Sequence, residues 1–313
     1  MQGRLIELIQ ARGAIVVLAV VVVVAALAFP DFLHLGNVQD IVTAATFLGL
    51  VAVGQTFVII MGGFDLAVGS MVSVGTVLAA YAVPYGWAAA LLLPTAAGIL
   101  VGLIDGMLIA RARMAPFIVT LSALLALKGA AVALAGESLV IRHPGFFGAI
   151  ANSQILGINS LILILLAIFA LAALLLNQTP FGAAVFAIGG NEEAARMLGI
   201  RVERVKIITY CLSGGLAGLS GALLAARLSS GLSGAGNGYE LQSIAAAVIG
   251  GVLLTGGVGT MAGALAGVLL LGVIENIINQ IGSLSAAYQG LASGVFLLLA
   301  VIIQSGLSRG RAR

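Results

Sequence analysis

The feature that most limits the fold of this chain is the length of its segments without a charged side chain. Residues 144–191 form a run of 48 residues without Asp, Glu, Lys or Arg, and residues 207–226 form another of 20. Only 8% of all residues are charged, whereas about a quarter are charged in soluble domains. Because a helix needs about 20 apolar residues to cross a bilayer, these runs predict an integral membrane protein.

The same runs favour helices over strands. A β-barrel needs short segments of alternating polarity, and the unbroken apolar stretches exclude it. The 43 glycines suit helices that pack closely in lipid, where small residues let backbones approach. We therefore predict an all-α integral membrane protein with about ten transmembrane helices. The expected spans are residues 14–29, 40–65, two within 66–110, 115–135, 161–176, 207–226, 241–254, 261–281 and 287–303.

The basic residues predict the orientation of these spans. With both termini in the cytoplasm, eleven of the fourteen Lys and Arg residues fall in cytoplasmic segments, and the opposite orientation violates the positive-inside rule. The chain is expected to be a single transmembrane permease domain over residues 1–313, with a cytoplasmic loop at about 178–206 and an outer loop at about 136–160. The small net charge follows from topology and gives no reason to expect nucleic-acid binding. The single cysteine, Cys211, excludes a disulfide framework and a thiolate metal site.

The predicted cytoplasmic loop at residues 178–206 carries seven of the 25 charged residues of the chain. A short helix is predicted inside it. Asn191 is a favourable N-cap, Glu192 and Glu193 occupy the first turn, where the helix dipole favours anions, and Gly199 can close the C-terminus. These signals predict a short helix with defined ends in a charged loop of an otherwise strongly apolar protein.

One face of this helix is expected to bind a partner. Ala194, Ala195 and Leu198 share that face and form a small apolar stripe bordered by charge. The chain has no Walker A sequence, no HExxH and no GxSxG, so it is not expected to be an enzyme or to bind a cofactor or metal itself. Energy for any active process would have to come from another subunit.

A polar stripe marks the span at 261–281. Glu275, Asn276, Asn279 and Gln280 follow helical spacing, and such residues within a span face the inside of a bundle. The stripe either lines a polar conduit or ties helices together. The chain has few residues that could form a proton relay across the membrane. Both histidines fall in predicted outer loops, and few acidic residues lie within spans.

Several separate segments resemble one family. AVGQTFVIIMGGFDLAVGS (residues 52–70) resembles the Gly-Ile-Asp-Leu-Ser-Val-Gly block of permeases from ribose-type bacterial ABC importers, and TPFGAAVFAIGGNEEAARMLGI (residues 179–200) resembles their cytoplasmic coupling loop. GLIDGMLIARARMAPFIVTL, GYELQSIAAAVIGGVLLTGGVGT and GVIEN also match in the family's order, so the resemblance covers nearly the whole chain. The departures are Phe64, Ala67, Asp105, Ala115 and Gln242, of which Gln242 removes a charge near the predicted outer mouth.

The resemblance implies the permease subunit of an ATP-driven, binding-protein-dependent importer in the bacterial inner membrane. Its solute would be a monosaccharide or a sugar-like molecule. It implies three protein partners: a second permease subunit, identical or paralogous, a cytoplasmic ABC ATPase that holds ATP and Mg, and a periplasmic sugar-binding protein. The alternative is a secondary transporter of a small polar solute with its own ion coupling, which the scarcity of acidic residues within spans disfavours.

The segment around residues 62–70 is the predicted start of a translocation pathway. Gly62 and Gly63 break the helical pattern, and free backbone in lipid costs several kcal/mol, so the segment needs a protein-lined or aqueous setting. Asp65 is expected to cap the next helix rather than to contact solute. Gln55 and Thr56 either line the pathway or form interhelical hydrogen bonds.

Overall fold

The computed structural model describes residues 2–281 and 294–295, with side chains described from residue 13 onward. The predicted span at 287–303, apart from residues 294 and 295, and the predicted position of the C-terminus lie outside these residues.

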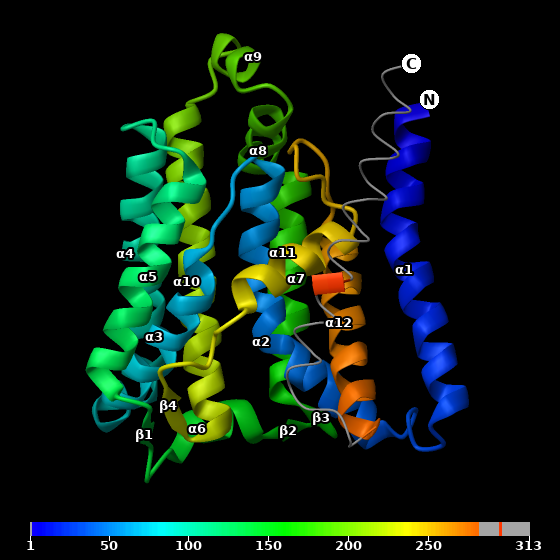
Figure 1. Ribbon diagram of the computed structural model, residues 1–313, viewed down its shortest axis with the longest axis vertical. Coiled ribbons are helices and arrows are strands. Elements are labelled where there is room, and N and C mark those ends of the chain that lie inside the picture. Colours follow the sequence, from blue (N-terminus) through cyan, green and yellow to red (C-terminus); the bar gives the residue numbers. More distant parts are fainter. Residues whose placement is uncertain (1, 282–293, 296–313) are drawn as a thin grey trace.

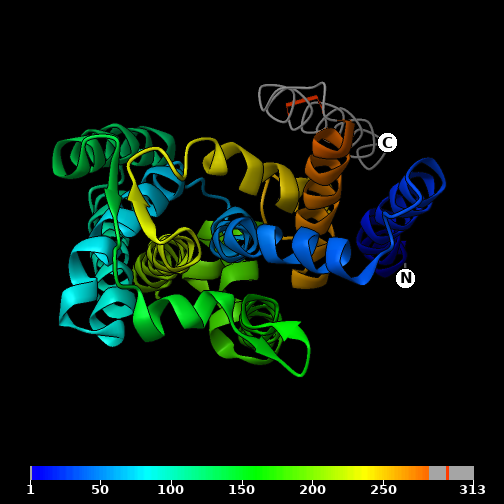
Figure 2. The ribbon, with the colours of Figure 1, turned by 90° about the horizontal axis from the view of Figure 1, so that it is seen from below.

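Long helices dominate the described part of the chain, and seven of them are long and apolar enough to cross a membrane. They form an upright bundle in Figure 1. The seven are α2 (Leu35–Ile60), α3 (Ala67–Ala82) with its extension η1 (Val83–Tyr85), α4 (Trp87–Ala110), α5 (Pro116–Ala135), α7 (Ser160–Gln178), α10 (Val202–Leu228) and α12 (Met261–Ile281). A further helix, α1 (Gln2–Ala28), lies at the edge of the bundle beside α12 (Figures 1 and 2). The all-α membrane fold is confirmed, whereas the count of ten remains a prediction.

The two ends of the bundle differ in structure. Two short helices, α8 (Pro180–Gly190) and α9 (Glu192–Met197), lie at the top of Figure 1, and we name this the α9 end. The opposite end, named the hairpin end, carries short strands. There β1 (Ser138–Val140) pairs with β4 (Ser230–Leu232), and β2 (Gln154–Ile155) pairs with β3 (Ile158–Asn159), both antiparallel. With α6 (Gly145–Asn152), the strands β1, β2 and β3 occupy the predicted outer loop.

The predicted continuous span at 241–254 is wrong. The structure has α11 (Tyr239–Ile249) there, and its 11 residues reach only about 16 Å at 1.5 Å per residue, against a hydrocarbon core of about 30 Å. The helix ends because Gly250 and Gly251 follow, and Gly251 adopts a φ of +88°, which side-chain-bearing residues rarely take. Apolar composition alone suggested a full crossing, but this glycine pair interrupts it.

A second non-helical segment connects two of the long helices. The chain is non-helical between α2 and α3, at residues 61–66, with Gly62 at a φ of +87°. Tyr210 of α10 donates a hydrogen bond to the carbonyl of Phe64 at 3.2 Å and so supports this segment. The backbone groups that leave helical bonding here lie within protein, as the bilayer requires.

The segment before α11 contacts α3 inside the bundle. The backbone N–H of Gly236, just before α11, donates to Ser73 Oγ at 3.0 Å, and that of Leu232 donates to Thr76 Oγ1 at 2.9 Å. A Cβ at Gly236 would collide with the carbonyl oxygen of Gly69, so the backbones touch. Two side chains of α3 therefore accept hydrogen bonds from a segment about 160 residues later in the chain.

A seam without side chains joins α4 to α10 near the centre of the bundle, where α10 also packs beside α2 (Figure 2). A Cβ at Gly98 would meet the backbone of Gly214, and one at Gly102 would meet the carbonyl carbon of Tyr210 at 2.6 Å. Small residues at every fourth position allow this approach, as is usual for helices packed in lipid.

Candidate functional site

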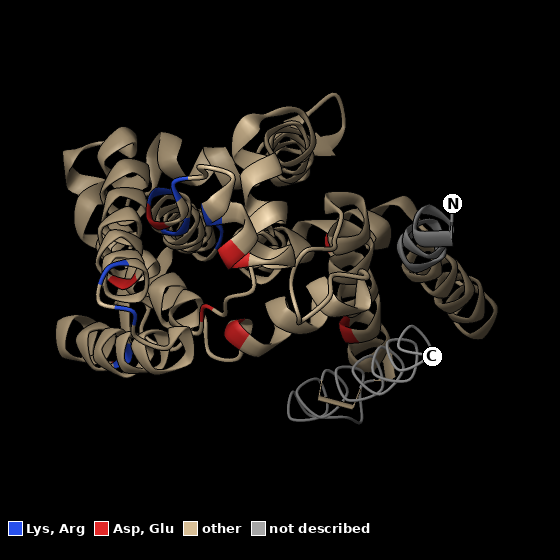
Figure 3. Cartoon of the chain, turned by 90° about the horizontal axis from the view of Figure 1, so that it is seen from above, with Lys and Arg blue, Asp and Glu red and all other residues tan. Residues whose placement is uncertain are grey.

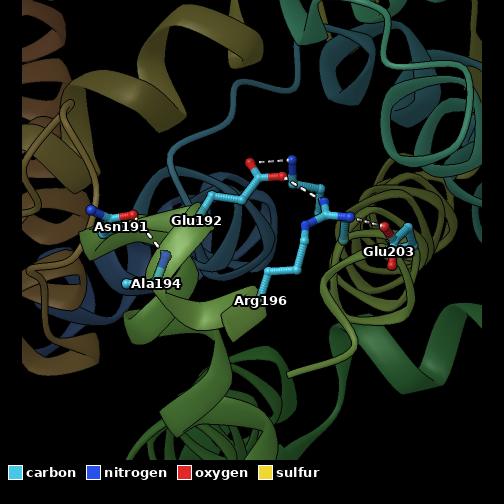
Figure 4. Close-up of polar contacts among 6 residues, drawn as sticks. Asn191, Glu192, Ala194, Arg196 and Glu203 are labelled. Carbon is cyan, nitrogen blue, oxygen red and sulfur yellow. Dashed lines mark hydrogen bonds and ion pairs between the residues drawn. The ribbon is translucent and has the colours of Figure 1, made fainter. Parts of the chain in front are cut away.

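The α9 helix has the predicted caps at both ends. Asn191 Oδ1 accepts a hydrogen bond from the backbone N–H of Ala194 at 2.9 Å (Figure 4), and Gly199 adopts a φ of +81°. The backbone N–H of Ile200 donates to the carbonyl of Ala195 at 3.1 Å, which closes the C-terminal turn. Because polar groups at both ends are satisfied, this six-residue helix holds its shape at the end of the bundle.

Ion pairs fix α9 to the start of α10. Glu192 lies 2.7 Å from Lys206 Nζ, and Arg196 lies 2.7 Å from Glu203 and 3.3 Å from Glu192 (Figure 4). Burial favours a raised pKa for Glu192, but hydrogen bonds and charges from Lys206 and Arg196 lower that pKa below its ordinary value. Because the pKa of Glu192 is lowered, these pairs stabilise the fold at any pH above the ordinary pKa of a glutamate. The stabilisation is lost only when the pH falls through the lowered pKa of Glu192.

The predicted apolar face of α9 is wrong in one residue. Ala195 is buried, with 1% of its surface exposed, and points into the protein, while Ala194 is exposed. Met197 and Leu198 are exposed at 86% and 81%, so they form the outward apolar surface. Sequence spacing indicated the faces of the helix, but which face packs against the rest of the protein depends on the complete fold. Met197 was missed, although its position before the closing glycine was a usable signal.

A charged pocket of about 640 Å³ lies between α9 and the turn that joins α4 to α5. Its lining includes Arg113, Glu192, Glu193, Arg196 and Lys206. Figure 3, seen from the α9 end, has Lys and Arg residues gathered over this side of the bundle. Among the described residues, no group of three or more His, Cys, Asp or Glu could hold a metal ion.

The predicted pathway residues on α2 have different surroundings. Thr56 donates to the carbonyl of Ala52 at 2.6 Å within its own helix. Gln55 is fully buried, and neither its Nε2 nor its Oε1 has a hydrogen-bond partner among the described residues.

The neighbours of α2 set the direction of Gln55. Gly49 packs on α7, Gly54 on α10 and Ala45 on α12, which at about 100° per residue leaves Gln55 on the side facing α11. Figure 2 has α11 on that side, opposite α7.

Asp65 holds the interrupted segment between α2 and α3. Its Oδ1 accepts a hydrogen bond from the backbone N–H of Ala67 at 3.0 Å, and its Oδ2 accepts one from Ser213 Oγ at 2.7 Å. Gly54 packs against the same Ser213, which brings Asp65 close to the Gln55 turn of α2. Ser213 and Tyr210, the two α10 residues that fix the segment at Gly62 and Gly63, were not predicted, since their partners lie almost 150 residues away.

The polar stripe on α12 is not part of this group. Asn276 Nδ2 donates to Asn37 Oδ1 at 2.9 Å, and Gln280 Nε2 donates to Asn276 Oδ1 at 2.8 Å. Asn276 and Gln280 therefore tie α12 to the start of α2 at the hairpin end. Glu275 is partly exposed, and Asn279 also makes an interaction. The structure thus separates the predicted pathway residues into a group around Asp65 and a group on α12.

The fold defines a class of protein, a multi-pass helical membrane protein. Residues 37–301 match the family described as branched-chain amino acid transport system / permease component. The ribose import permease protein RbsC of Bacillus subtilis is 36% identical over 94% of this chain and 92% of its own length. RbsC of Escherichia coli K12 is 35% identical over 95% of this chain and 94% of its own length. The L-arabinose ABC transporter permease protein AraH of Azospirillum brasilense is 37% identical over 96% of this chain and 89% of its own length. The chain belongs to this family of permease components.

Proposed function

We propose that this chain is the permease subunit of an ATP-driven importer of a monosaccharide or sugar-like solute in the bacterial inner membrane. The observation that carries the proposal is the likeness to ribose and L-arabinose import permeases over more than nine-tenths of the chain. The α9 helix supports it independently, because a capped helix anchored by ion pairs presents Met197 and Leu198 to solvent. A soluble partner that covers this apolar surface explains its exposure.

The partners follow from this assignment. The basic α9 end faces the cytoplasm, in line with the positive-inside rule, and receives an ABC ATPase that binds ATP and Mg. A periplasmic sugar-binding protein meets the hairpin end. A second permease, identical or paralogous, completes the pathway. ATP-driven closure of the ATPase pushes on α9 and rocks the bundle between outward-open and inward-open states.

Purification from native membranes tests the assignment. We expect the tagged chain to co-purify with an ABC ATPase, and vanadate, but not an uncoupler, to stop uptake of radiolabelled D-ribose or L-arabinose by cells. Mass spectrometry of the complex distinguishes an identical from a paralogous second permease. Isolation without an ATPase, together with uptake that an uncoupler abolishes, would instead establish an ion-coupled secondary transporter.

We propose that the pathway passes Gln55 near the interruption at Gly62, Gly63 and Asp65. A buried amide without a partner is costly, and a polyhydroxylated solute supplies both a donor and an acceptor to it. Gln55→Leu is therefore expected to lower sugar uptake about tenfold, in line with the 1–3 kcal/mol that an unpaired polar group is worth. Thr56→Val is the matched control, because the Thr56 hydroxyl is satisfied within α2. Normal uptake by the Gln55→Leu complex would remove Gln55 from the pathway.

The α12 residues Glu275, Asn276 and Asn279 belong to the proposed pathway only as supports at the outer end. The Asn276 amide is committed to Asn37, so its contribution is to hold α12 against α2 beside the route.

A further inference from the structure

A three-way backbone contact lies directly beneath α9. The backbone N–H of Gly257, in the turn between α11 and α12, donates to the carbonyl of Ile60, the last residue of α2, at 2.8 Å. Gly189 of α8 lies against both. A Cβ at Gly189 would overlap the Ile60 carbonyl oxygen and approach the Gly257 nitrogen to 2.6 Å. We name Ile60, Gly189 and Gly257 the backbone junction.

The junction joins the end of α8, just before α9, to the end of α2 and to the turn after α11. Gly189 stands two residues before Asn191, the N-cap of α9. Ile60 is followed at once by the interruption at residues 61–66, and Gly257 belongs to the turn that follows α11. A Cβ at Gly256 would also meet Gly62 Cα at 3.1 Å, so the two turns touch each other as well as α8.

The contact is stiff because no side chain lies between the three backbones. Side chains can change rotamer and absorb a displacement, whereas backbone atoms in van der Waals contact pass it on. A second contact, between the rings of Phe181 on α8 and Phe57 on α2, has centroids 6.0 Å apart and joins the same two helices beside the junction.

We propose that Gly189 is a positioning residue through which movement of α9 reaches the end of α2 and the turn after α11 together, with the backbone junction kept intact during transport. This inference rests on the proposed function. It adds that the force applied by the ATPase reaches the end of α2 and the turn after α11 at one shared contact, besides the ion pairs that hold α9 to α10.

Gly189→Ala tests the inference, with Gly190→Ala as the matched control. No described atom lies within 4 Å of the position that a Cβ would take at Gly190, so that variant changes the same helix end without touching the junction. The complete complex with its ATPase and binding protein is reconstituted in proteoliposomes, and radiolabelled D-ribose or L-arabinose taken up per ATP hydrolysed is measured. We expect a drop of at least tenfold for Gly189→Ala and the wild-type ratio for Gly190→Ala.

A purely structural role for Gly189 would lower the yield of assembled complex but leave this ratio unchanged, and that result would overturn the inference while the proposed function stood. If the Gly189→Ala complex does not assemble, hydrogen exchange of the wild-type complex tests the inference instead. The Gly257 amide is expected to stay protected with and without vanadate-trapped nucleotide. Loss of its protection in the trapped state would mean that the junction opens, which overturns the inference.

Discussion

Gly102→Val is expected to abolish production of the folded permease. The new side chain would have to enter the seam where Gly102 touches the backbone of Tyr210 and where Cys211 Cα would lie 2.8 Å from its Cβ. Neither helix can yield without separating α4 from α10, and the cost should exceed about 3 kcal/mol, the upper range for overpacked cores. We expect at least a tenfold loss of monodisperse protein in size-exclusion chromatography of detergent extracts.

Gly129→Val is the matched control for this variant. Gly129 lies on the exposed side of α5, and a Cβ at this position would have no described atom within 4 Å, so the same substitution meets open space. Its yield should equal that of the wild type. Equal losses from the two variants would show that valine disturbs these helices through propensity and not through the seam.

The double variant Met197→Asp, Leu198→Asp is expected to release the ATPase. Both side chains are largely exposed, so the fold should survive, but two carboxylates would face an apolar surface of the partner. Loss of a central apolar contact typically costs about 2 kcal/mol or more, which weakens binding by about 30-fold or more. We expect the ATPase to disappear from the purified complex and sugar uptake to fall with it.

Leu156→Asp controls for the added charge. Leu156 is 98% exposed at the tip of the β2–β3 turn, at the hairpin end and far from α9 in Figure 1. The ATPase should remain bound to this variant. If the double variant Met197→Asp, Leu198→Asp also kept the ATPase bound, Met197 and Leu198 would not form its binding surface.

Local signals in the sequence predicted what depends on local chemistry. The apolar runs gave most of the membrane helices, and Asn191 and Gly199 gave the two ends of α9. The burial of Ala195 could not be predicted in this way, because it depends on how α9 packs against parts of the protein that are distant in sequence.

The interruption after α11 had a visible signal in Gly250 and Gly251, but glycines are common throughout this chain, and several of them lie in seams between continuous helices, such as Gly98, Gly102 and Gly214. The partners of Asp65 and Asn276 could not be predicted, because they are distant in sequence and are brought close only by the complete fold.

The contact between α3 and the segment before α11 also constrains how the chain matures in a membrane. The α11 helix is too short to be stable across lipid by itself, and its approach segment bonds to Ser73 and Thr76 in α3. When α3 leaves the ribosome, the residues that satisfy it have not been synthesised. Its surroundings are therefore completed only after residues 232–236 have been synthesised, so this part of the core forms late in the biogenesis of the protein.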